Sequence, residues 1–223
     1  METFLCFGEK HPDISFIFVN DGSNDGTADL IKQYCGRQIQ LLSLPRNFGK
    51  AEAVRQGIRS ALEQGFYRIG FWDADLSTPL EQICSFLDKM DREENFDMII
   101  GSRIHRLGAH IKRNVGRHII GRILMSIVYS SVDFVVYDSQ CGAKIMTAAV
   151  AGAITDKPFI TRWLFDLEML IRLQRVRQQD SLGSIVYEYP LAEWHETGHS
   201  KVRVCSVLID LFRFFFYYKL KKI

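Results

Sequence analysis

Two aspartates one residue apart, Asp73 and Asp75, follow the apolar run 68–72 and are the strongest candidates for chemistry in this sequence. The run has the composition of a buried strand, and residues 76–79 are typical of a turn into a helix. Side chains two residues apart on an extended chain face the same way, about 6–7 Å apart. A bend lets both carboxylates approach one cation, and such oxygen ligands suit Mg²⁺ or Mn²⁺ when substrate phosphates complete the shell. The structural alternative is a helix start capped by Asp75 or Ser77.

The size and composition of the chain indicate one compact domain. With 223 residues, 47% of them hydrophobic, the chain can bury a sizeable core without disulfides or structural metals. Its five cysteines are widely spaced and include no CxxC pair, which indicates reduced thiols in a cytosolic compartment rather than a disulfide framework or a zinc site. The net charge of +2 says little about partners.

Basic residues are concentrated in a stretch that lacks acids. Residues 98–132 contain no Asp or Glu. The lysines and arginines of this stretch are Arg103, Arg106, Lys112, Arg113, Arg117 and Arg122. Solvated surfaces usually interleave both signs of charge, so we favour a local anion-binding site over a plain basic face. Nucleic acid is a weaker candidate, because no aromatic platform accompanies the basic residues.

The last part of the sequence is unusually aromatic. Residues 207–218 are mostly apolar and rich in Phe and Tyr, and Lys219, Lys221 and Lys222 follow them. A ring-rich helix that ends in lysines is typical of a segment lying in the plane of a membrane surface. The alternatives are a helix packed on the sheet and a contact between subunits. We expect no membrane-spanning helix, because the sequence has no uncharged run of the length a bilayer requires.

Predicted strands and helices alternate, which is typical of a parallel sheet with helices on both faces. The predicted strands are 16–19, 39–44, 69–72, 98–101, a turn and strand at 138–146, and 184–190, and the predicted helices are 27–34, 49–64, 79–90 and 165–176. Ligands of such sheets bind beyond the carboxyl ends of the strands. Asp21, Asp73, Asp75 and Arg103 all follow predicted strands, so we expect them at one rim.

Two turns contribute further candidates for that rim. Asp21 precedes Gly22 and Ser23, where glycine allows close approach of a ligand and the carboxylate could accept from a base or ribose. The structural alternative is an Asx turn. Lys50 follows Gly49 at a predicted helix start, where its ammonium and the backbone N–H groups could meet a phosphate. The glycine spacings of a P-loop and of a dinucleotide-binding fingerprint are absent.

Two acids and a late loop complete the set of candidates. Asp166 and Glu168 lie in the first turn of the predicted helix 165–176, where acidic residues usually complement the helix dipole. They remain candidates for a general base. Residues 194–201 are predicted to form a polar loop, in which Trp194 either belongs to a lid over the rim or serves packing.

Several ordered motifs resemble a known family. Residues 19–27 (VNDGSNDGT) resemble the DGSxDGT element of family-2 glycosyltransferases with the GT-A fold, and 73–75 (DAD) match their metal-binding DxD. Residues 101–103 (GSR) match polyprenyl-phosphate sugar synthases. The segments that look like the dolichyl-phosphate glucosyltransferase and mannose synthase branch are 47–51 (NFGKA), 138–144 (DSQCGAK) and 162–168 (RWLFDLE).

The resemblance implies a role for each matching position. Asp21, Ser23 and Lys50 would contact the nucleotide-sugar donor. Asp73 and Asp75 would bind the Mg²⁺ or Mn²⁺ held on its diphosphate. Acceptor phosphate would be bound by Arg103, Arg113 and Arg117, and Asp166 would belong to the catalytic group. The predicted organisation is a GT-A domain over residues 1–204, an α/β fold with a mostly parallel sheet, followed by an amphipathic helix over 205–223.

Two features depart from the family pattern. Relatives of the mannose-synthase type often have glutamine two residues after the DxD, where this chain has Ser77, so a third direct protein ligand to the metal is not expected. Family members also begin with a strand that lines the base pocket, whereas only about 14 residues precede the strand at 16–19, and residues 1–7 look like the helix that follows that strand. A sheet without this strand would expose an unpaired edge, which predicts low stability or self-association.

The resemblance implies inverting transfer of glucose or mannose from a UDP- or GDP-hexose to a polyprenyl phosphate. The expected location is the cytoplasmic face of a membrane, with the protein bound peripherally, and a homo-oligomer is a further expectation. One alternative is a GT-A enzyme acting on a soluble or polysaccharide acceptor, with Asp166 or Glu168 as base. The other is a non-catalytic protein that binds nucleotide sugars.

Overall fold

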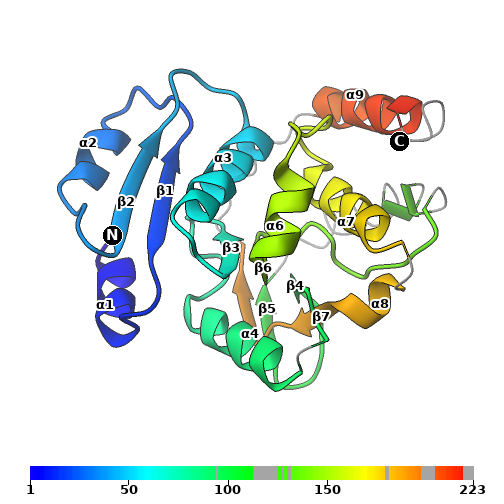
Figure 1. Cartoon of the computed structure of the whole chain (residues 1–223), viewed down its shortest axis with the longest axis horizontal. Coiled ribbons are helices and arrows are strands. Elements are labelled where there is room, and N and C mark those ends of the chain that lie inside the picture. Colours follow the sequence, from blue (N-terminus) through cyan, green and yellow to red (C-terminus); the bar gives the residue numbers. More distant parts are fainter. Residues whose placement is uncertain are drawn as a thin grey trace.

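The computed structural model describes residues 1–93, 95–112, 125–126, 128–129, 132–178, 181–196 and 204–217. The helices are α1 (Glu2–Lys10), α2 (Thr27–Lys32), α3 (Lys50–Glu63), α4 (Glu81–Arg92), α6 (Ala148–Thr155), α7 (Phe165–Val176), α8 (Leu182–Ile185) and α9 (Val204–Phe215) (Figure 1). The strands are β1 (Phe16–Asn20), β2 (Ile39–Ser43), β3 (Arg68–Trp72), β4 (Met98–Ser102), β5 (His110–Lys112), β6 (Ala143–Thr147), β7 (Val186–Pro190) and β8 (Glu193–His195).

The described strands form three sheets that are parallel except at β6. Strands β1 and β2 pair in parallel, and so do β5 and β8. The largest sheet has the order β3-β6-β4-β7, in which β4 and β7 are parallel while β6 runs antiparallel to both of its neighbours. This arrangement confirms the predicted α/β fold with a mostly parallel sheet.

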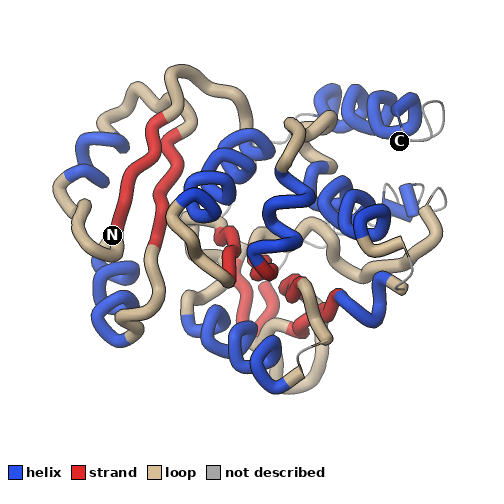
Figure 2. The backbone as a smooth tube through the Cα atoms, in the orientation of Figure 1, coloured by secondary structure: helices blue, strands red, loops and turns tan. Residues whose placement is uncertain are grey.

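Helices cover both faces of the large sheet, and the side chains of its strands alternate between them. Met98 and Ile100 of β4 pack into a core shared with α3, α6 and α7, whereas Ile99 packs into a second core with α1 and α4. This alternation follows from the two-residue period of a strand. Figure 2 shows α3, α6 and α7 on one side of these strands and α4 on the other. Lys144 of β6 is two residues from Met146, so it faces the α7 side.

Most predicted elements lie within a few residues of their predicted positions, with one clear exception. The predicted loop at 194–201 was wrong at its start, because Trp194 lies in β8 and pairs with Ile111 of β5. Trp194 is 9% exposed and packs in the core, as the packing alternative expected. The predicted strand at 184–190 also starts late, since the short helix α8 occupies its first residues.

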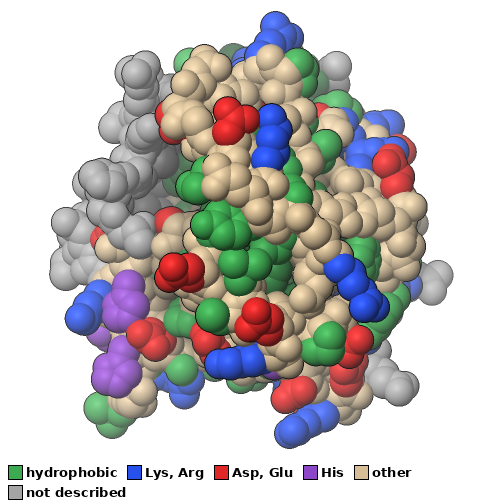
Figure 3. Space-filling model, turned by 90° about the vertical axis from the view of Figure 1, so that its left-hand side faces the viewer, with side chains coloured by type: hydrophobic (Ala, Val, Ile, Leu, Met, Phe, Trp, Pro, Cys, Tyr) green, Lys and Arg blue, Asp and Glu red, His purple; other side chains and the backbone are tan. Residues whose placement is uncertain are grey.

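Strands β1 and β3 each have a single partner among the described strands. β1 pairs with β2, and β3 pairs with β6, although α3 packs against both β1 and β3. Gly57 lets α3 approach β1 closely, since a Cβ there would lie 2.9 Å from Cγ2 of Val19. Among the described strands, one edge of β1 and one edge of β3 are therefore unpaired, while low stability and self-association stay predictions. On the side where β1 and β2 lie, hydrophobic side chains are visible between acidic and basic ones (Figure 3).

Candidate active site

The turn after β1 is joined to the start of α3 by a carboxylate. Asp21 accepts hydrogen bonds from the backbone N–H groups of Phe48 at 2.7 Å and Gly49 at 2.8 Å. Gly22 has φ +70°, and a Cβ there would collide with the backbone of Arg46, so this close approach requires glycine. Asp21 thus fixes the segment that presents Lys50. Its predicted contact with a nucleotide stays a prediction.

Ser23 is exposed in the same turn. Its backbone N–H donates to Oδ1 of Asn20 at 3.0 Å, which ties the turn to the end of β1. The hydroxyl therefore stands on a fixed turn at the predicted rim.

The first aspartate of the DxD pair lies against Lys50. The Lys50 Nζ is 2.6 Å from Oδ1 of Asp73, and both side chains are partly exposed. The N–H of Asp73 donates to the carbonyl of Gly142, where any side chain would collide with the Asp73 carboxylate. The site is thus built from the ends of β1 and β3, the start of α3 and the turn before β6.

Negative charge dominates the surroundings of Lys50. Burial disfavours its ammonium, but the nearby carboxylates of Asp73, Asp166 and Asp75 outweigh this effect and raise the pKa of Lys50. Asp73 and Asp75 outnumber Lys50 at this rim, whereas Asp166 is buried, so the two rim carboxylates are the candidates for binding a cation.

The predicted alternative of a helix start capped by Asp75 or Ser77 was wrong, because α4 begins at Glu81 with Leu80 at its N-cap. Oδ1 of Asp75 accepts from the N–H of Ser77 at 2.9 Å, which supports the turn after β3, and Leu76 in that turn has φ +56°. The side chain is nevertheless exposed at the rim. Asp75 is therefore positioned by the turn while it faces solvent.

The residues present fit a divalent cation held jointly with a ligand. The described residues contain no cluster of three His, Cys, Asp or Glu side chains that would hold a metal by themselves. Asp73 and Asp75 supply oxygen atoms next to a glycine that keeps the carboxylate accessible. Mg²⁺ in particular is commonly bound by one or two carboxylates together with substrate phosphates.

A buried ion pair lies behind this rim. The Nζ of Lys144 on β6 is 2.5 Å from Oδ1 of Asp166 on α7 and donates to the carbonyl of Cys141 at 2.6 Å. Lys144 has no exposed surface, and it lies 5.0 Å from the centre of the Phe71 ring. Burial raises the pKa of Asp166, while the ammonium groups of Lys144 and Lys50 oppose this rise. Asp166 lies near the rim, where it forms a buried ion pair with Lys144. Its predicted catalytic role stays a prediction.

Arg103 is held by a carboxylate of its own. Its guanidinium makes two 2.6 Å contacts with Asp138, whose Oδ2 also accepts the Arg103 backbone N–H at 3.0 Å. The guanidinium lies 5.1 Å from the centre of the Trp194 ring. Burial works against its charge, but Asp138, and more weakly Cys141 and Asp166, raise the pKa of Arg103. An acceptor-binding role for Arg103 stays a prediction, as do those of Arg113 and Arg117, which lie outside the described residues.

The family follows from a comparison with known proteins. The family model described as glycosyl transferase family 2 matches residues 3–150. The chain belongs to this family.

Several curated relatives of this chain share one description. A dolichyl-phosphate beta-glucosyltransferase of Trichomonas vaginalis is 30% identical over 212 residues, which cover 91% of this chain and 60% of the relative. A protein of the same description from Dictyostelium discoideum is 32% identical over 207 residues, covering 87% of this chain and 59% of the relative. The chain therefore spans about 60% of the length of these relatives.

Solved structures establish the fold of this family 2 chain as GT-A. Glucosyl-3-phosphoglycerate synthase from Mycobacterium tuberculosis, in complex with Mn²⁺, UDP-glucose and glycerol 3-phosphate, has a TM-score of 0.59 at 15% identity. The match covers 89% of this chain and 67% of that one. In complex with UDP the same synthase gives a TM-score of 0.56 at 16% identity, covering 83% of this chain and 61% of that one.

Sequence reasoning missed three residues that shape the site of this family 2 chain. Lys144 had a signal, since it is the one charged residue of β6, and a buried lysine requires a partner. Asp210 had a similar signal as the single acid in the aromatic segment 207–218. Gly142 is required because the Asp73 carboxylate lies against it, and no local sequence pattern reveals this long-range contact.

Proposed function

We propose that the chain is the catalytic part of a glycosyltransferase that moves glucose from a nucleotide-sugar donor, UDP-glucose, to dolichyl or polyprenyl phosphate. The observation that carries this proposal is the match, over 91% of the chain, to dolichyl-phosphate beta-glucosyltransferases. The match favours glucose over mannose. UDP-glucose is the donor bound by the M. tuberculosis synthase of similar fold, which supports UDP over GDP.

The donor end of the reaction is assigned to Asp73, Asp75 and Lys50. Asp73 and Asp75 would hold Mg²⁺ or Mn²⁺, which when bound neutralises the charge that develops on the leaving diphosphate. Lys50 pairs with Asp73. When a cation binds Asp73 in place of the Lys50 ammonium, Lys50 would turn toward a phosphate. Asp21 keeps the turn that carries Lys50 in position.

The interactions of the two candidate bases, Asp166 and Glu168, indicate which kind of acceptor the site suits. Asp166 is paired with Lys144, and Glu168 accepts backbone N–H groups of residues 160–161 and pairs with Arg172 at 2.7 Å. A hydroxyl acceptor needs a base to take its proton, whereas a lipid phosphate is already an anion at neutral pH. The engagement of both acids therefore supports a phosphate acceptor, whose attack would invert the anomeric carbon.

The proposed function is tested by sugar transfer with radiolabelled UDP-glucose, dolichyl phosphate and Mn²⁺. Label in the organic-extractable lipid fraction is the expected result. Label in a water-soluble product would favour the soluble-acceptor alternative. UDP-glucose binding without transfer would favour the non-catalytic alternative.

Helix α9 is the part of the chain that we assign to the membrane surface. Leu211 and Phe214 are buried against the protein, whereas Ile209, Phe212 and Phe216 are 54%, 72% and 43% exposed. No described helix has the length and apolar character needed to cross a bilayer. An exposed apolar stripe on a docked helix is suited to peripheral binding, and the acceptor lipid places it at a membrane face. The cytoplasmic side remains part of the proposal.

Removing two rings from this stripe is expected to weaken membrane binding. Because a fully buried Phe side chain contributes about 1.5–3 kcal/mol, the Phe212→Ser, Phe216→Ser double variant should lose at least roughly 10-fold in partitioning to vesicles. The measurement is flotation with vesicles of phosphatidylserine and phosphatidylcholine. Leu30→Ser, at a residue that is 50% exposed on α2, is the matched control. Equal flotation of both variants and the parent would contradict the assignment of α9.

A further inference from the structure

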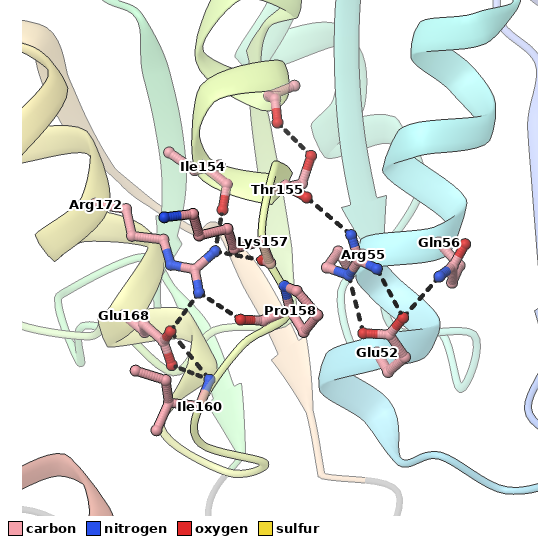
Figure 4. Close-up of polar contacts among 11 residues, drawn as sticks. Glu52, Arg55, Gln56, Ile154, Thr155, Lys157, Pro158, Ile160, Glu168 and Arg172 are labelled. Atoms are coloured by element: carbon pink, nitrogen blue, oxygen red, sulfur yellow. Dashed lines mark hydrogen bonds and ion pairs between the residues drawn. The ribbon is translucent and has the colours of Figure 1, made fainter. Parts of the chain in front are cut away.

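The loop between α6 and α7 is held by two buried carboxylates. Glu168 of α7 accepts the N–H groups of Ile160 and Thr161, at 3.0 Å and 3.2 Å. Arg172 pairs with Glu168 and donates to the carbonyl oxygens of Ile154 in the last turn of α6 and of Lys157 and Pro158 at the start of the loop, as Figure 4 shows. Glu168 is 7% exposed. This end of the loop is therefore fixed by α7 itself.

The other end of the loop is held from α9. Oδ2 of Asp210 accepts the N–H groups of Arg162 at 2.8 Å and Trp163 at 2.5 Å, and Asp210 is 3% exposed. Together the two carboxylates accept four consecutive backbone N–H groups. A buried carboxylate is costly unless it is hydrogen-bonded, so this arrangement fixes the loop conformation at both ends.

The fixed loop presents one arginine toward the rim. Arg162 is exposed, and its guanidinium makes no ion pair or hydrogen bond in the part of the chain that the structure describes. A Cβ on Gly49 would lie 3.9 Å from Cδ of Arg162, which places the side chain next to the residue that precedes Lys50. By contrast, Arg103 and Arg172 are paired with acids.

We propose that Arg162 is a phosphate-binding residue of this site and that Asp210 positions it from α9. A planar guanidinium that has no carboxylate partner among the described residues is suited to bidentate binding of phosphate oxygens. Lys50 lies beside it and shares the same ligand. This inference rests on the proposed function for the identity of the ligand, since the phosphate belongs either to the donor diphosphate or to the acceptor lipid.

The first experiment separates these two sources in the full chain. Arg162→Gln is tested for UDP binding with Mn²⁺ by titration calorimetry and for farnesyl phosphate binding by the same method. A loss of about 10- to 100-fold in one affinity is expected, as for removal of a charge-assisted hydrogen bond. Loss with UDP assigns Arg162 to the donor, and loss with farnesyl phosphate assigns it to the acceptor. Unchanged affinity for both would overturn the proposal.

The matched control is Arg37→Gln. Arg37 is exposed in the turn before β2, at the opposite end of the strands from the rim. It should bind both ligands like the parent. If it loses as much affinity as Arg162→Gln, the effect is one of overall charge and the proposal fails.

The second experiment tests the positioning role of Asp210. Both N–H groups donate to a single oxygen, so Asp210→Asn can keep them through its amide oxygen, whereas Asp210→Ala cannot. Asp210→Ala should reproduce the affinity loss of Arg162→Gln, and Asp210→Asn should restore most of it. The double variant Arg162→Gln, Asp210→Ala should bind no more weakly than either single variant, because both changes remove the same interaction, that of Arg162 with the phosphate. Fully additive losses would overturn the positioning role.

The outcomes also separate this inference from the proposed function. If the parent binds UDP through Arg162 but transfers no glucose to dolichyl phosphate, the proposed function fails and the inference stands. If the parent transfers glucose and Arg162→Gln transfers it with the same KM for both substrates, the inference fails and the function stands.

Discussion

Replacing Asp75 with Asn is expected to abolish metal-dependent donor binding while leaving the fold intact. The amide oxygen of Asn can still accept the N–H of Ser77, so the turn after β3 keeps its support. The variant loses a negative charge beside Asp73 and Lys50, where a divalent cation would sit. Because loss of an outer-shell partner alone typically costs about 10–100-fold in metal affinity, loss of a direct ligand should cost at least roughly 100-fold.

The measurement is titration calorimetry of UDP in the presence and absence of Mn²⁺. The parent should bind UDP more tightly with Mn²⁺, and Asp75→Asn should show no such difference. Asp29→Asn is the matched control, since Asp29 is an exposed acid on α2 paired with Lys32. Mn²⁺-dependent heats that match the parent would refute the role of Asp75 in the metal site.

The rim could be predicted from the sequence because its residues follow strands. Asp21 and Asp73 come directly after β1 and β3, and the carboxyl ends of parallel strands meet at one edge. Lys50 could be added because it follows a glycine and begins a predicted helix. The ion pair between Lys50 and Asp73 therefore joins residues that local patterns had already placed together.

The partners of the buried charges could not be predicted in the same way. Arg103 was expected to face an acceptor phosphate, but it pairs with Asp138, which is 35 residues away in the sequence. Asp166 looked like an ordinary acid of a first helical turn, yet it pairs with Lys144 of β6, which is 22 residues away in the sequence. Asp210 sits in a segment whose aromatic residues favoured a membrane-surface helix, with a helix packed on the sheet or a subunit contact as the alternatives. Such pairs depend on how segments that are distant in the sequence pack together, which periodicity does not specify.

Removing the buried ammonium of Lys144 is expected to give the largest loss of stability. Lys144→Met keeps the length of the side chain but removes the ammonium that pairs with Asp166. The Asp166 carboxylate, which is 3% exposed, is then buried without this partner. Breaking a buried pair from one side typically costs about 3–5 kcal/mol. Lys32→Met, which breaks the exposed pair with Asp29, should cost little by comparison. Urea denaturation followed by circular dichroism measures the free energy of unfolding of each variant.

A double-mutant cycle separates the charge from the packing. Lys144→Met combined with Asp166→Leu removes both charges, so its loss should be clearly smaller than the sum of the two single losses. A double variant as unstable as that sum would mean that the two residues contribute independently and that the pair has no special role.

The pH dependence of Lys144→Met gives an independent check on the same pair. Burial already raises the pKa of Asp166, and loss of the Lys144 ammonium removes an opposing effect, so the pKa of Asp166 should rise further. A carboxyl group whose pKa is higher in the folded than in the unfolded state binds its proton more tightly when folded, and stability then falls as pH rises through the interval between the two values. The stability deficit of Lys144→Met should therefore be smallest in mild acid and largest at neutral pH. A deficit that stays constant from mild acid to neutral pH would mean that Asp166 does not carry the uncompensated charge.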